Sequence, residues 1–279
     1  MNPQRDRSID LETVEIELLL EGVFRVYGYD FRNYASASLK RRIWHTVRRE
    51  NLTTISALQD KILHDPACLE RFVLNLSINV TSMFRDPSFY LALRTHVVPL
   101  LRTYPFIRIW HAGCATGEEV YSMAILLQEE NLYHRCRLYA TDINEEVIKK
   151  AKTGIFPVDL MQEYAQNYLQ AGGKRSFSEY YTAAYNSAIF RTALKENMVF
   201  SQHNLVTDSS FNEFHVILCR NVLIYFNQEL QAQVYKLFHD SLINFGILGL
   251  GKPETLKFTP YEQKYQQLVA TEKLYRRSS

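Results

Sequence analysis

A turn of small residues followed by two acids is the part of this sequence best suited to bind a ligand. It lies in the run Ile-Trp-His-Ala-Gly-Cys-Ala-Thr-Gly-Glu-Glu-Val-Tyr over residues 109–121. Gly113 and Gly117, with Ala115 between them, leave room for backbone N–H groups to approach a ligand closely. Apolar residues precede the turn and recur at helical spacing after it, which predicts a strand, a turn and a helix in that order.

Glu118 and Glu119 narrow the kind of ligand that this turn can bind. The N-terminus of a helix attracts phosphate, but two carboxylates at that place would repel it. The turn also lacks the Lys-Ser or Lys-Thr pair of a phosphate-binding loop. An acidic side chain suits a ligand that carries a positive charge and hydroxyl groups, such as S-adenosylmethionine. The turn therefore predicts nucleoside binding without a nucleotide phosphate.

Polar residues also stand at the ends of three further apolar runs. Asp142 ends one run, His203-Asn204-Leu205 follows the next, and Arg220-Asn221 follows the last. In an open α/β sheet, ligands bind at the carboxyl ends of the strands, and a carboxylate there can accept both ribose hydroxyls. Each residue also has a purely structural interpretation, because a strand-end Asp can cap the next helix and an Asn can stabilise a turn. Four polar strand ends in register favour one shared site.

The elements that would position these residues alternate along the last two thirds of the chain. Apolar runs predict strands at residues 107–112, 137–141, 198–202 and 214–219, with helical patterns between them. Such alternation predicts an α/β domain with a mostly parallel sheet covered on both faces. Residues 172–196 are rich in Tyr, Ser and Ala and have a weak helical period, so we expect a small β-hairpin insertion there.

The first third of the chain has the pattern of a helical bundle. The expected buried positions are Leu11, Val14, Leu18 and Val23 in an opening helix and Leu39, Ile43 and Val47 in a second. Gly28 should end the first helix, Thr54 should start a third, and Pro66 can occupy the first turn of a fourth. After Asp86-Pro87, a further helix is expected over residues 88–102.

Length and composition fit two domains. The chain has 279 residues, 47% of them hydrophobic, and we expect a helical domain at residues 1–82 and an α/β domain at residues 83–279, with the β insertion near 172–196. A net charge of +2 argues against nucleic acid as a partner. The four cysteines form no C-x-x-C pair and are expected to be buried thiols. The sequence shows neither a signal peptide nor a bilayer-spanning stretch, which predicts a cytoplasmic protein without membrane insertion.

Several blocks, taken together and in order, resemble the CheR-type methyltransferases, which esterify glutamates on bacterial chemoreceptors with S-adenosylmethionine. The blocks are Asn-Val-Thr-Ser-Met-Phe-Arg-Asp at 79–86, Gly-Cys-Ala-Thr-Gly-Glu-Glu at 113–119, Tyr-Ala-Thr-Asp-Ile at 139–143, Asn-Leu at 204–205 and Cys-Arg-Asn-Val-Leu-Ile-Tyr-Phe at 219–226. The first and last blocks together are the most specific. The resemblance covers nearly the whole chain and implies a Rossmann-like methyltransferase fold with an N-terminal all-helical domain and a small inserted β-subdomain.

The resemblance also implies site residues. S-adenosylmethionine would be the cofactor, S-adenosylhomocysteine the product, and no metal is implied. Arg85 and Tyr225 are the candidate catalytic residues. The candidate cofactor contacts are Asn79, Thr81, Arg85, Glu118, Asp142, Asn204, Leu205, Arg220 and Asn221. No general base is required, because a glutamate with an unperturbed pKa of ~4.3 is already ionised at neutral pH.

The implied roles differ along the cofactor. Glu118 and Asp142 would hold the methionyl and ribose parts, and the adenine would lie against Asn204, Leu205, Arg220 and Asn221. A purely structural role is the strongest alternative to cofactor binding at Leu205, which has the character of a core residue. A structural role is the weakest alternative at Arg85, because the Arg85 guanidinium follows apolar Met83 and Phe84 and needs an anionic partner.

Receptor methylation helices are acidic, so the resemblance implies a basic docking surface on the second helix. The candidates are Lys40, Arg41, Arg42, Arg48 and Arg49. A solvated basic face explains the same residues equally well. Some family members hold a receptor's C-terminal peptide on the β insertion by strand addition. Residues 172–196 carry no clear signature for that, which favours a peptide-independent enzyme.

Two places depart from the family pattern. His111 stands where a small residue is usual, either as a core histidine or at the cofactor rim. Leu-Gly-Leu-Gly-Lys-Pro-Glu at 248–254 replaces the commoner Gly-His-Ser-Glu, a change that bears on the acceptor pocket more than on the cofactor site. Two other functions stay open at this point: a methyltransferase with a different acceptor, and a non-catalytic regulator that binds the cofactor.

Overall fold

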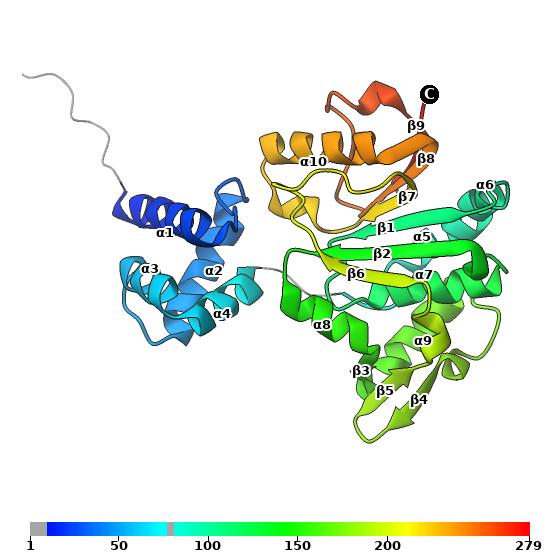
Figure 1. Cartoon of the computed structure of the whole chain (residues 1–279), viewed down its shortest axis with the longest axis horizontal. Coiled ribbons are helices and arrows are strands. Elements are labelled where there is room, and N and C mark those ends of the chain that lie inside the picture. The colour runs from blue at the N-terminus through cyan, green and yellow to red at the C-terminus, as the bar shows by residue number, and fades with distance from the viewer. Residues whose placement is uncertain (1–9, 77–80) are drawn as a thin grey trace, which may run out of the picture. The chain divides into compact units, whose positions relative to one another are not determined.

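The structure is a computed structural model that describes residues 10–76 and 81–279, without the side chain of Ser38. The chain divides into two compact units (Figure 1). A helical unit comprises Met1–Ile78 with Tyr225–Leu230, and a sheet unit comprises Asn79–Ile224 with Gln231–Ser279. Most of the candidate site residues belong to the sheet unit.

The described part of the helical unit contains α1 (Leu11–Tyr27), α2 (Ser36–Arg49), α3 (Ile55–His64) and α4 (Pro66–Leu76). The ends of these helices follow from local chemistry. The Asp10 side chain caps α1, and Gly28 ends that helix with a φ of 78°, in the left-handed region that favours glycine. The Thr54 hydroxyl caps α3 by accepting a hydrogen bond from the Ala57 N–H at 3.1 Å. The predicted end of α1 and start of α3 are therefore confirmed.

The buried faces of α1 and α2 test the predicted apolar stripes. All three stripe residues of α2 are buried, which confirms that prediction. The stripe predicted for α1 is wrong in part, because Leu11 and Leu18 are exposed whereas Leu19, Leu20 and Val23 are buried. Three consecutive leucines fit more than one helical face, and packing against α3 selects the face that is buried.

A seven-stranded sheet forms the centre of the sheet unit. From one edge to the other its strands are β6 (Met198–Gln202), β2 (Cys136–Asp142), β1 (Ile107–Ala112), β7 (Phe214–Cys219), β8 (Leu242–Leu250), β10 (Leu274–Arg277) and β9 (Tyr265–Val269). The first five pair in parallel, and β10 pairs antiparallel with β8 and β9. The mostly parallel α/β sheet is therefore confirmed, while β8, β9 and β10 lie outside the four strands whose bounds were predicted.

Helices cover both faces of this sheet (Figure 1). α7 (Glu118–Glu129) and α8 (Glu145–Thr153) lie on one face, and α10 (Gln228–Ser241) lies on the other. Trp110 of β1 is fully buried and packs against Phe214 and Phe238. Because both faces are covered by apolar packing, polar side chains gather where the parallel strands end.

An interrupted helical segment leads into β1. The sequence predicts one helix over residues 88–102, whereas the structure has α5 (Pro87–Ala92), a π-helical turn (Leu93–Val97) and α6 (Val98–Leu101). Pro99 accounts for the interruption, because it has no N–H to donate and its ring crowds the carbonyl of the preceding turn. The wider π turn relieves that crowding.

A three-stranded antiparallel sheet forms the inserted β-subdomain, in the order β3 (Ile155–Pro157), β5 (Ser187–Phe190) and β4 (Tyr181–Ala184). The hairpin of β4 and β5 lies within residues 172–196, where a hairpin was predicted. β3 precedes that range and is separated from the hairpin by α9 (Met161–Gln170). The subdomain therefore takes its third strand from earlier in the chain.

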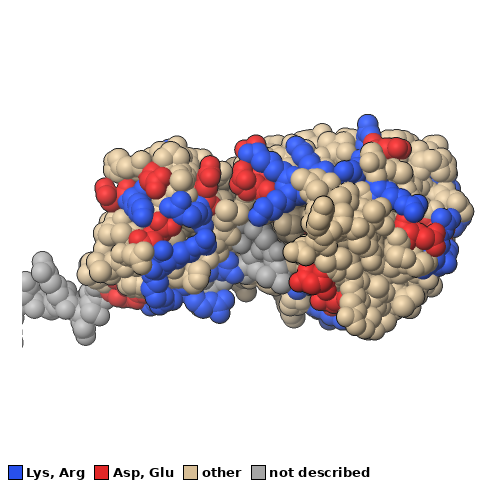
Figure 2. Space-filling model, turned by 90° about the horizontal axis from the view of Figure 1, so that it is seen from below, with Lys and Arg blue, Asp and Glu red and all other residues tan. Residues whose placement is uncertain are grey.

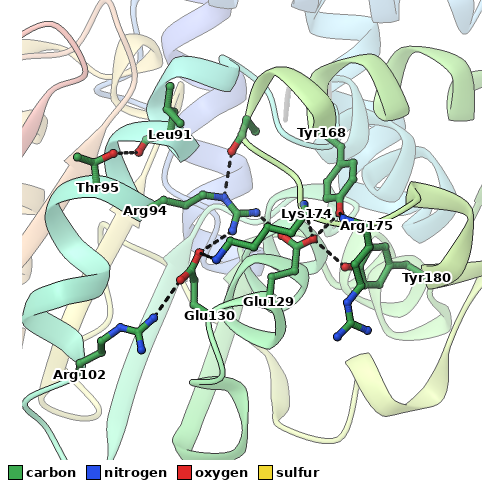
Figure 3. Close-up of polar contacts among 11 residues, drawn as sticks. Leu91, Arg94, Thr95, Arg102, Glu129, Glu130, Tyr168, Lys174, Arg175 and Tyr180 are labelled. Carbon is green, nitrogen blue, oxygen red and sulfur yellow. Dashed lines mark hydrogen bonds and ion pairs between the residues drawn. The ribbon is translucent and has the colours of Figure 1, made fainter.

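A buried network of charged and phenolic side chains holds the segment before β4 against α7 (Figure 3). The Arg94 guanidinium, in the π turn, donates hydrogen bonds to Glu129 and Glu130. Glu129 Oε1 also accepts a hydrogen bond from the Tyr180 hydroxyl at 3.0 Å and from the Lys174 N–H at 2.9 Å. These bonds join three separate stretches of chain and fix the β-subdomain on the main sheet.

The four cysteines are buried and free, as predicted. Short 3-10 turns occur at Tyr133–Arg135, Val158–Leu160, Phe177–Tyr180, Thr192–Leu194, Leu223–Tyr225 and Glu262–Lys264. Across residues 10–76 and 81–279, none of the helices has the length and apolar character that crossing a bilayer demands.

Candidate functional site

The glycine turn between β1 and α7 is shaped by close packing. Gly113 and Gly117 have φ angles of 76° and 96°, which glycine adopts without strain. A Cβ on Gly113 would lie 2.5 Å from Cγ2 of Val222, so the loop after β7 packs directly on the turn. Ala115 has a φ of 48°, and strained backbone of this kind gathers at ligand sites. The N–H groups of Gly113 and Cys114 donate to the Thr141 carbonyl and that of Ala115 donates to Asp142, so a ligand contact through backbone N–H groups stays a prediction.

Asp142 is the last residue of β2 and is only 8% exposed. Its carboxylate accepts hydrogen bonds from the N–H groups of Ala115 and Asn144, each at 3.0 Å. Burial raises the pKa of Asp142, and these backbone N–H groups oppose the rise. Because the Ala115 N–H belongs to the glycine turn, the carboxylate lies beside that turn, where the sequence predicts a ribose-binding acid.

Glu118 begins α7 and is 5% exposed. Burial raises the pKa of its carboxyl to about 7, although the Thr116 hydroxyl opposes the rise by donating a hydrogen bond to Oε2 at 2.7 Å. The buried hydroxyl of Tyr164, in α9, interacts with the same carboxyl. In the described part of the chain no cation pairs with Glu118. A cationic group on a ligand would stabilise the ionised form of this carboxyl.

Glu254, which the sequence did not single out as a site residue, holds the loop after β7. Its buried carboxylate accepts hydrogen bonds from the N–H groups of Gly251, Asn221, Val222 and Leu223, at 2.6 to 3.1 Å. Asn221 adopts a φ of 62°, and its Oδ1 atom is buried without a partner among the described residues. The acid at the end of the unusual 248–254 segment was the signal that could have identified this role.

Arg220 follows β7, and its side chain is 3% exposed. Nη2 donates hydrogen bonds to the Asp86 carboxylate at 2.8 Å and to the Arg85 carbonyl at 3.0 Å. Nη1 donates to Glu119 at 3.3 Å, and the guanidinium carbon lies 4.1 Å from the centre of the Phe89 ring. The sequence predicts a cofactor contact for Arg220, and the structure shows it bonded to the segment that carries Arg85.

The structure shows that His111 is a core histidine, which is the first of the two interpretations that the sequence allows. It is fully buried, and its Nδ1 atom lies 2.9 Å from Oε1 of Glu119. Burial alone would raise the pKa of Glu119, but His111 and Arg220 together hold it below its usual range. Glu119 is therefore an internal partner of His111 and Arg220, in contrast to Glu118 beside it.

The remaining candidate residues make fewer described contacts. Asn79 lies outside the described residues, and Thr81 is half-buried. The Asn204 Oδ1 atom accepts a hydrogen bond from the Val206 N–H at 3.0 Å, which is the turn-stabilising role of a strand-end Asn. Leu205 is 9% exposed, and Tyr225 groups with the helical unit. Their cofactor and catalytic roles stay predictions.

This geometry brings the glycine turn, two buried acids and the loop after β7 to one end of the sheet. Residues 79–273 match the family model described as the CheR methyltransferase SAM-binding domain, and residues 14–77 match the CheR methyltransferase all-alpha domain. The chain belongs to the CheR methyltransferase family. It is a methyltransferase that uses S-adenosylmethionine, so the resemblance seen in the sequence is confirmed.

Other CheR-type proteins are similar over most of the chain. A methyltransferase of Pseudomonas putida named Cher3 is 51% identical over 265 residues, which are 95% of this chain and 97% of that protein. A chemotaxis protein methyltransferase of Listeria innocua is 30% identical over 236 residues, 84% of this chain and 87% of that protein. The solved structure of PKMT2 from Rickettsia typhi is 16% identical with a TM-score of 0.37, covering 61% of this chain and 26% of that one. So distant a likeness adds nothing to the assignment.

The residues of the CheR site fit S-adenosylmethionine. Asp142 has a carboxylate fixed by backbone N–H groups that could accept ribose hydroxyls, and Glu118 is a buried acid that suits a cationic group such as the α-ammonium. The Oδ1 atom of Asn221 is a buried acceptor that a ligand donor can satisfy. The Val222 side chain packs so closely on Gly113 that a Cβ there would clash with it, so the turn needs glycine at this position.

Proposed function

We propose that this CheR-family enzyme methylates glutamate side chains of bacterial chemoreceptors in the cytoplasm and forms glutamate methyl esters. The observation that carries the proposal is the extent of the match to proteins named chemotaxis protein methyltransferases. It covers 84% of this chain in the Listeria innocua relative, and the family's all-alpha domain matches as well. An enzyme for an unrelated acceptor would need only the cofactor domain to be similar.

The mechanism requires orientation more than acid–base chemistry. S-adenosylmethionine, when bound, supplies a methyl group activated by its sulfonium. A glutamate acceptor is already ionised at neutral pH, so the site must align it and exclude water, and alignment can be worth roughly 7–11 kcal/mol. In this proposal Asp142 holds the ribose, Glu118 holds the α-ammonium group, and Arg85 pairs with the cofactor carboxylate. Tyr225 would border the acceptor.

Receptor docking is proposed for three arginines of α2 rather than for all five basic candidates. Lys40 is ion-paired with Glu12, and Arg42 donates hydrogen bonds to the carbonyls of Asn75 and Leu76 at the end of α4. Those two side chains stabilise the helical unit. Figure 2 shows Lys and Arg side chains gathered over the helical unit. The other three α2 candidates, Arg41, Arg48 and Arg49, are exposed. Exposed guanidinium groups complement an acidic receptor helix.

Transfer of labelled methyl groups tests the proposal. The purified chain is incubated with methyl-labelled S-adenosylmethionine and the cytoplasmic fragment of a chemoreceptor. Glutamate methyl esters release the label as methanol in mild base, whereas methylated amines keep it. We expect base-labile label on the fragment and almost none with Asp142→Ala. Base-stable label, or cofactor binding without any transfer to receptor fragments, would contradict glutamate esterification.

A further inference from the structure

The segment that carries Arg85 has a backbone conformation that the rest of the protein must hold in place. Phe84 and Asp86, on either side of Arg85, have φ angles of 52° and 56°. Residues other than glycine rarely adopt this region and persist there only when their surroundings fix them. On one side the Phe84 ring is fully buried, and its N–H donates a hydrogen bond to the Ser122 hydroxyl at 2.9 Å.

Arg220 fixes the other side of this segment. One amino group, Nη2, donates hydrogen bonds to both the Arg85 carbonyl and the Asp86 carboxylate. Asp86 precedes α5 but makes no capping hydrogen bond with its side chain. Its second oxygen lies 3.4 Å from Nζ of Lys252. The carboxylate of Asp86 is therefore used to hold the segment rather than to cap the helix.

Contacts with residues of α7 and α5 hold the Arg220 guanidinium in place. Glu119 accepts a hydrogen bond from Nη1 through Oε2, and its Oε1 atom contacts His111, which is fully buried in β1. Phe89 packs against the guanidinium face. The chain of contacts therefore runs from β1 through α7 to the loop after β7 and ends on the backbone of Arg85.

We propose that Arg220 is a positioning residue for methyl transfer that acts through Arg85. Its bonds to the Arg85 carbonyl and to Asp86 fix the direction in which the Arg85 side chain leaves the backbone, and Glu119 with His111 fixes Arg220. This inference rests on the proposed contact between Arg85 and the cofactor. Alignment errors near 1 Å can cost about a hundredfold in rate. Loosening this segment should therefore lower mainly kcat.

A double-mutant cycle tests the inference in the full-length enzyme. The variants are Arg85→Ala, Arg220→Met and the double variant, with the exposed Arg191→Met as a control for loss of one arginine. The readouts are calorimetric affinity for S-adenosylhomocysteine and kcat and KM for methyl transfer. We expect each single variant to lower kcat about a hundredfold and the double variant to be no worse than Arg85→Ala alone. The control should match the wild type.

Additive losses would overturn the proposal, because Arg220 would then act independently of Arg85. The alternative is a direct cofactor contact through Nε of Arg220, which has no partner among the described residues. An unchanged kcat in Arg220→Met, or in Arg85→Ala, would overturn it as well. Unchanged affinity for S-adenosylhomocysteine in Arg85→Ala would remove the cofactor contact on which the inference rests. That calorimetric measurement needs no acceptor, so its outcome does not depend on whether a chemoreceptor is the substrate.

Two gentler variants separate positioning from folding. Arg220→Lys keeps the positive charge but cannot bond the Arg85 carbonyl, Asp86 and Glu119 together. Asp86→Asn keeps the shape of the side chain but removes its charge. Both should leave the unfolding midpoint within a few degrees of the wild type and still lower kcat with KM little changed. A proportional loss of folded protein and activity would instead indicate a structural role only.

Discussion

Four acids near the CheR site differ in what they are bonded to. Asp142 and Glu254 are satisfied by backbone N–H groups, and Glu119 is satisfied by His111 and Arg220. Glu118 has hydroxyl neighbours and no cation among the described residues. Glu118 is therefore the acid whose charge state should respond most to a cationic ligand.

Affinity for S-adenosylhomocysteine should weaken as the pH falls below about 7. Burial raises the pKa of Glu118 to about 7 without ligand, and the α-ammonium group of the ligand favours the ionised carboxylate. Affinity is then full above that pKa and falls by up to about tenfold for each pH unit below it. Calorimetric titration from pH 6 to pH 8.5 measures the slope. Glu118→Gln should flatten it, and an unchanged slope in that variant would exclude Glu118 as its origin.

Asp142→Ala should weaken S-adenosylhomocysteine binding by about thirtyfold. Hydrogen bonds to a charged group contribute about 2 kcal/mol, and the variant leaves the ribose hydroxyls without their acceptor. The same calorimetric titration at pH 8 measures the loss, with the exposed Asp159→Ala as the matched control. Equal affinity in the two variants would remove Asp142 from the cofactor site.

At the scale of elements, the sequence predicts best what is local and apolar. The strands over residues 107–112, 198–202 and 214–219 were predicted with their observed bounds, because a buried parallel strand is a short continuous apolar run. The short strand β3 was missed, because three residues carry too little pattern to identify a strand. The π turn was also missed, although Pro99 signals a break.

The long-range contacts of the site could not be predicted from the sequence. Arg220 bonds to Asp86, which is 134 residues earlier in the chain, and no spacing rule links the two. The sequence predicts that Asp142 lies at the end of a strand. The hydrogen bond that its carboxylate accepts from the Ala115 N–H depends on how the glycine turn folds back. The sequence linked the segment that contains Glu254 to the acceptor pocket but missed its role in holding the loop after β7. Three of its four backbone partners lie more than thirty residues earlier in the chain.

Glu129→Gln should weaken the attachment of the β-subdomain and destabilise the sheet unit by about 3 kcal/mol. The buried Arg94 would then keep only one of its two carboxylate partners, Glu130. Burial alone would raise the pKa of Glu129, but hydrogen bonds from Tyr168, Lys174 and Arg94 hold it below its usual range. The stabilising effect is therefore full above the unfolded pKa of ~4.3 and is lost as the pH falls through the lower folded pKa.

Thermal unfolding between pH 3 and pH 8 measures this prediction. The midpoint of Glu129→Gln should lie about 6–12 °C below that of the wild type at pH 7, and the gap should narrow in acid. The exposed Glu163→Gln is the matched control. A gap that stays constant down to pH 3 would show that lost packing, rather than lost charge, destabilises the variant.

At the scale of the whole molecule, positive and negative side chains nearly cancel. The net charge is only +2, so an acidic receptor would be attracted by local surfaces and not by the protein as a whole. In α2, ion pairing and helix capping use two of the five basic candidates, which leaves Arg41, Arg48 and Arg49 facing solvent. This division predicts which charges matter for docking and which matter for folding.

Reversing Arg41 and Arg48 to Glu should lower kcat/KM for a receptor fragment by about tenfold or more and leave S-adenosylhomocysteine affinity unchanged. Two reversals remove the attraction that speeds encounter with an acidic helix, while the proposed cofactor contacts belong to the sheet unit. The loss should shrink at high salt, where surface charges are screened. Arg175→Glu with Arg191→Glu makes the same change in net charge at exposed positions of the sheet unit. If that pair slowed methylation equally, net charge and not the face of α2 would govern docking.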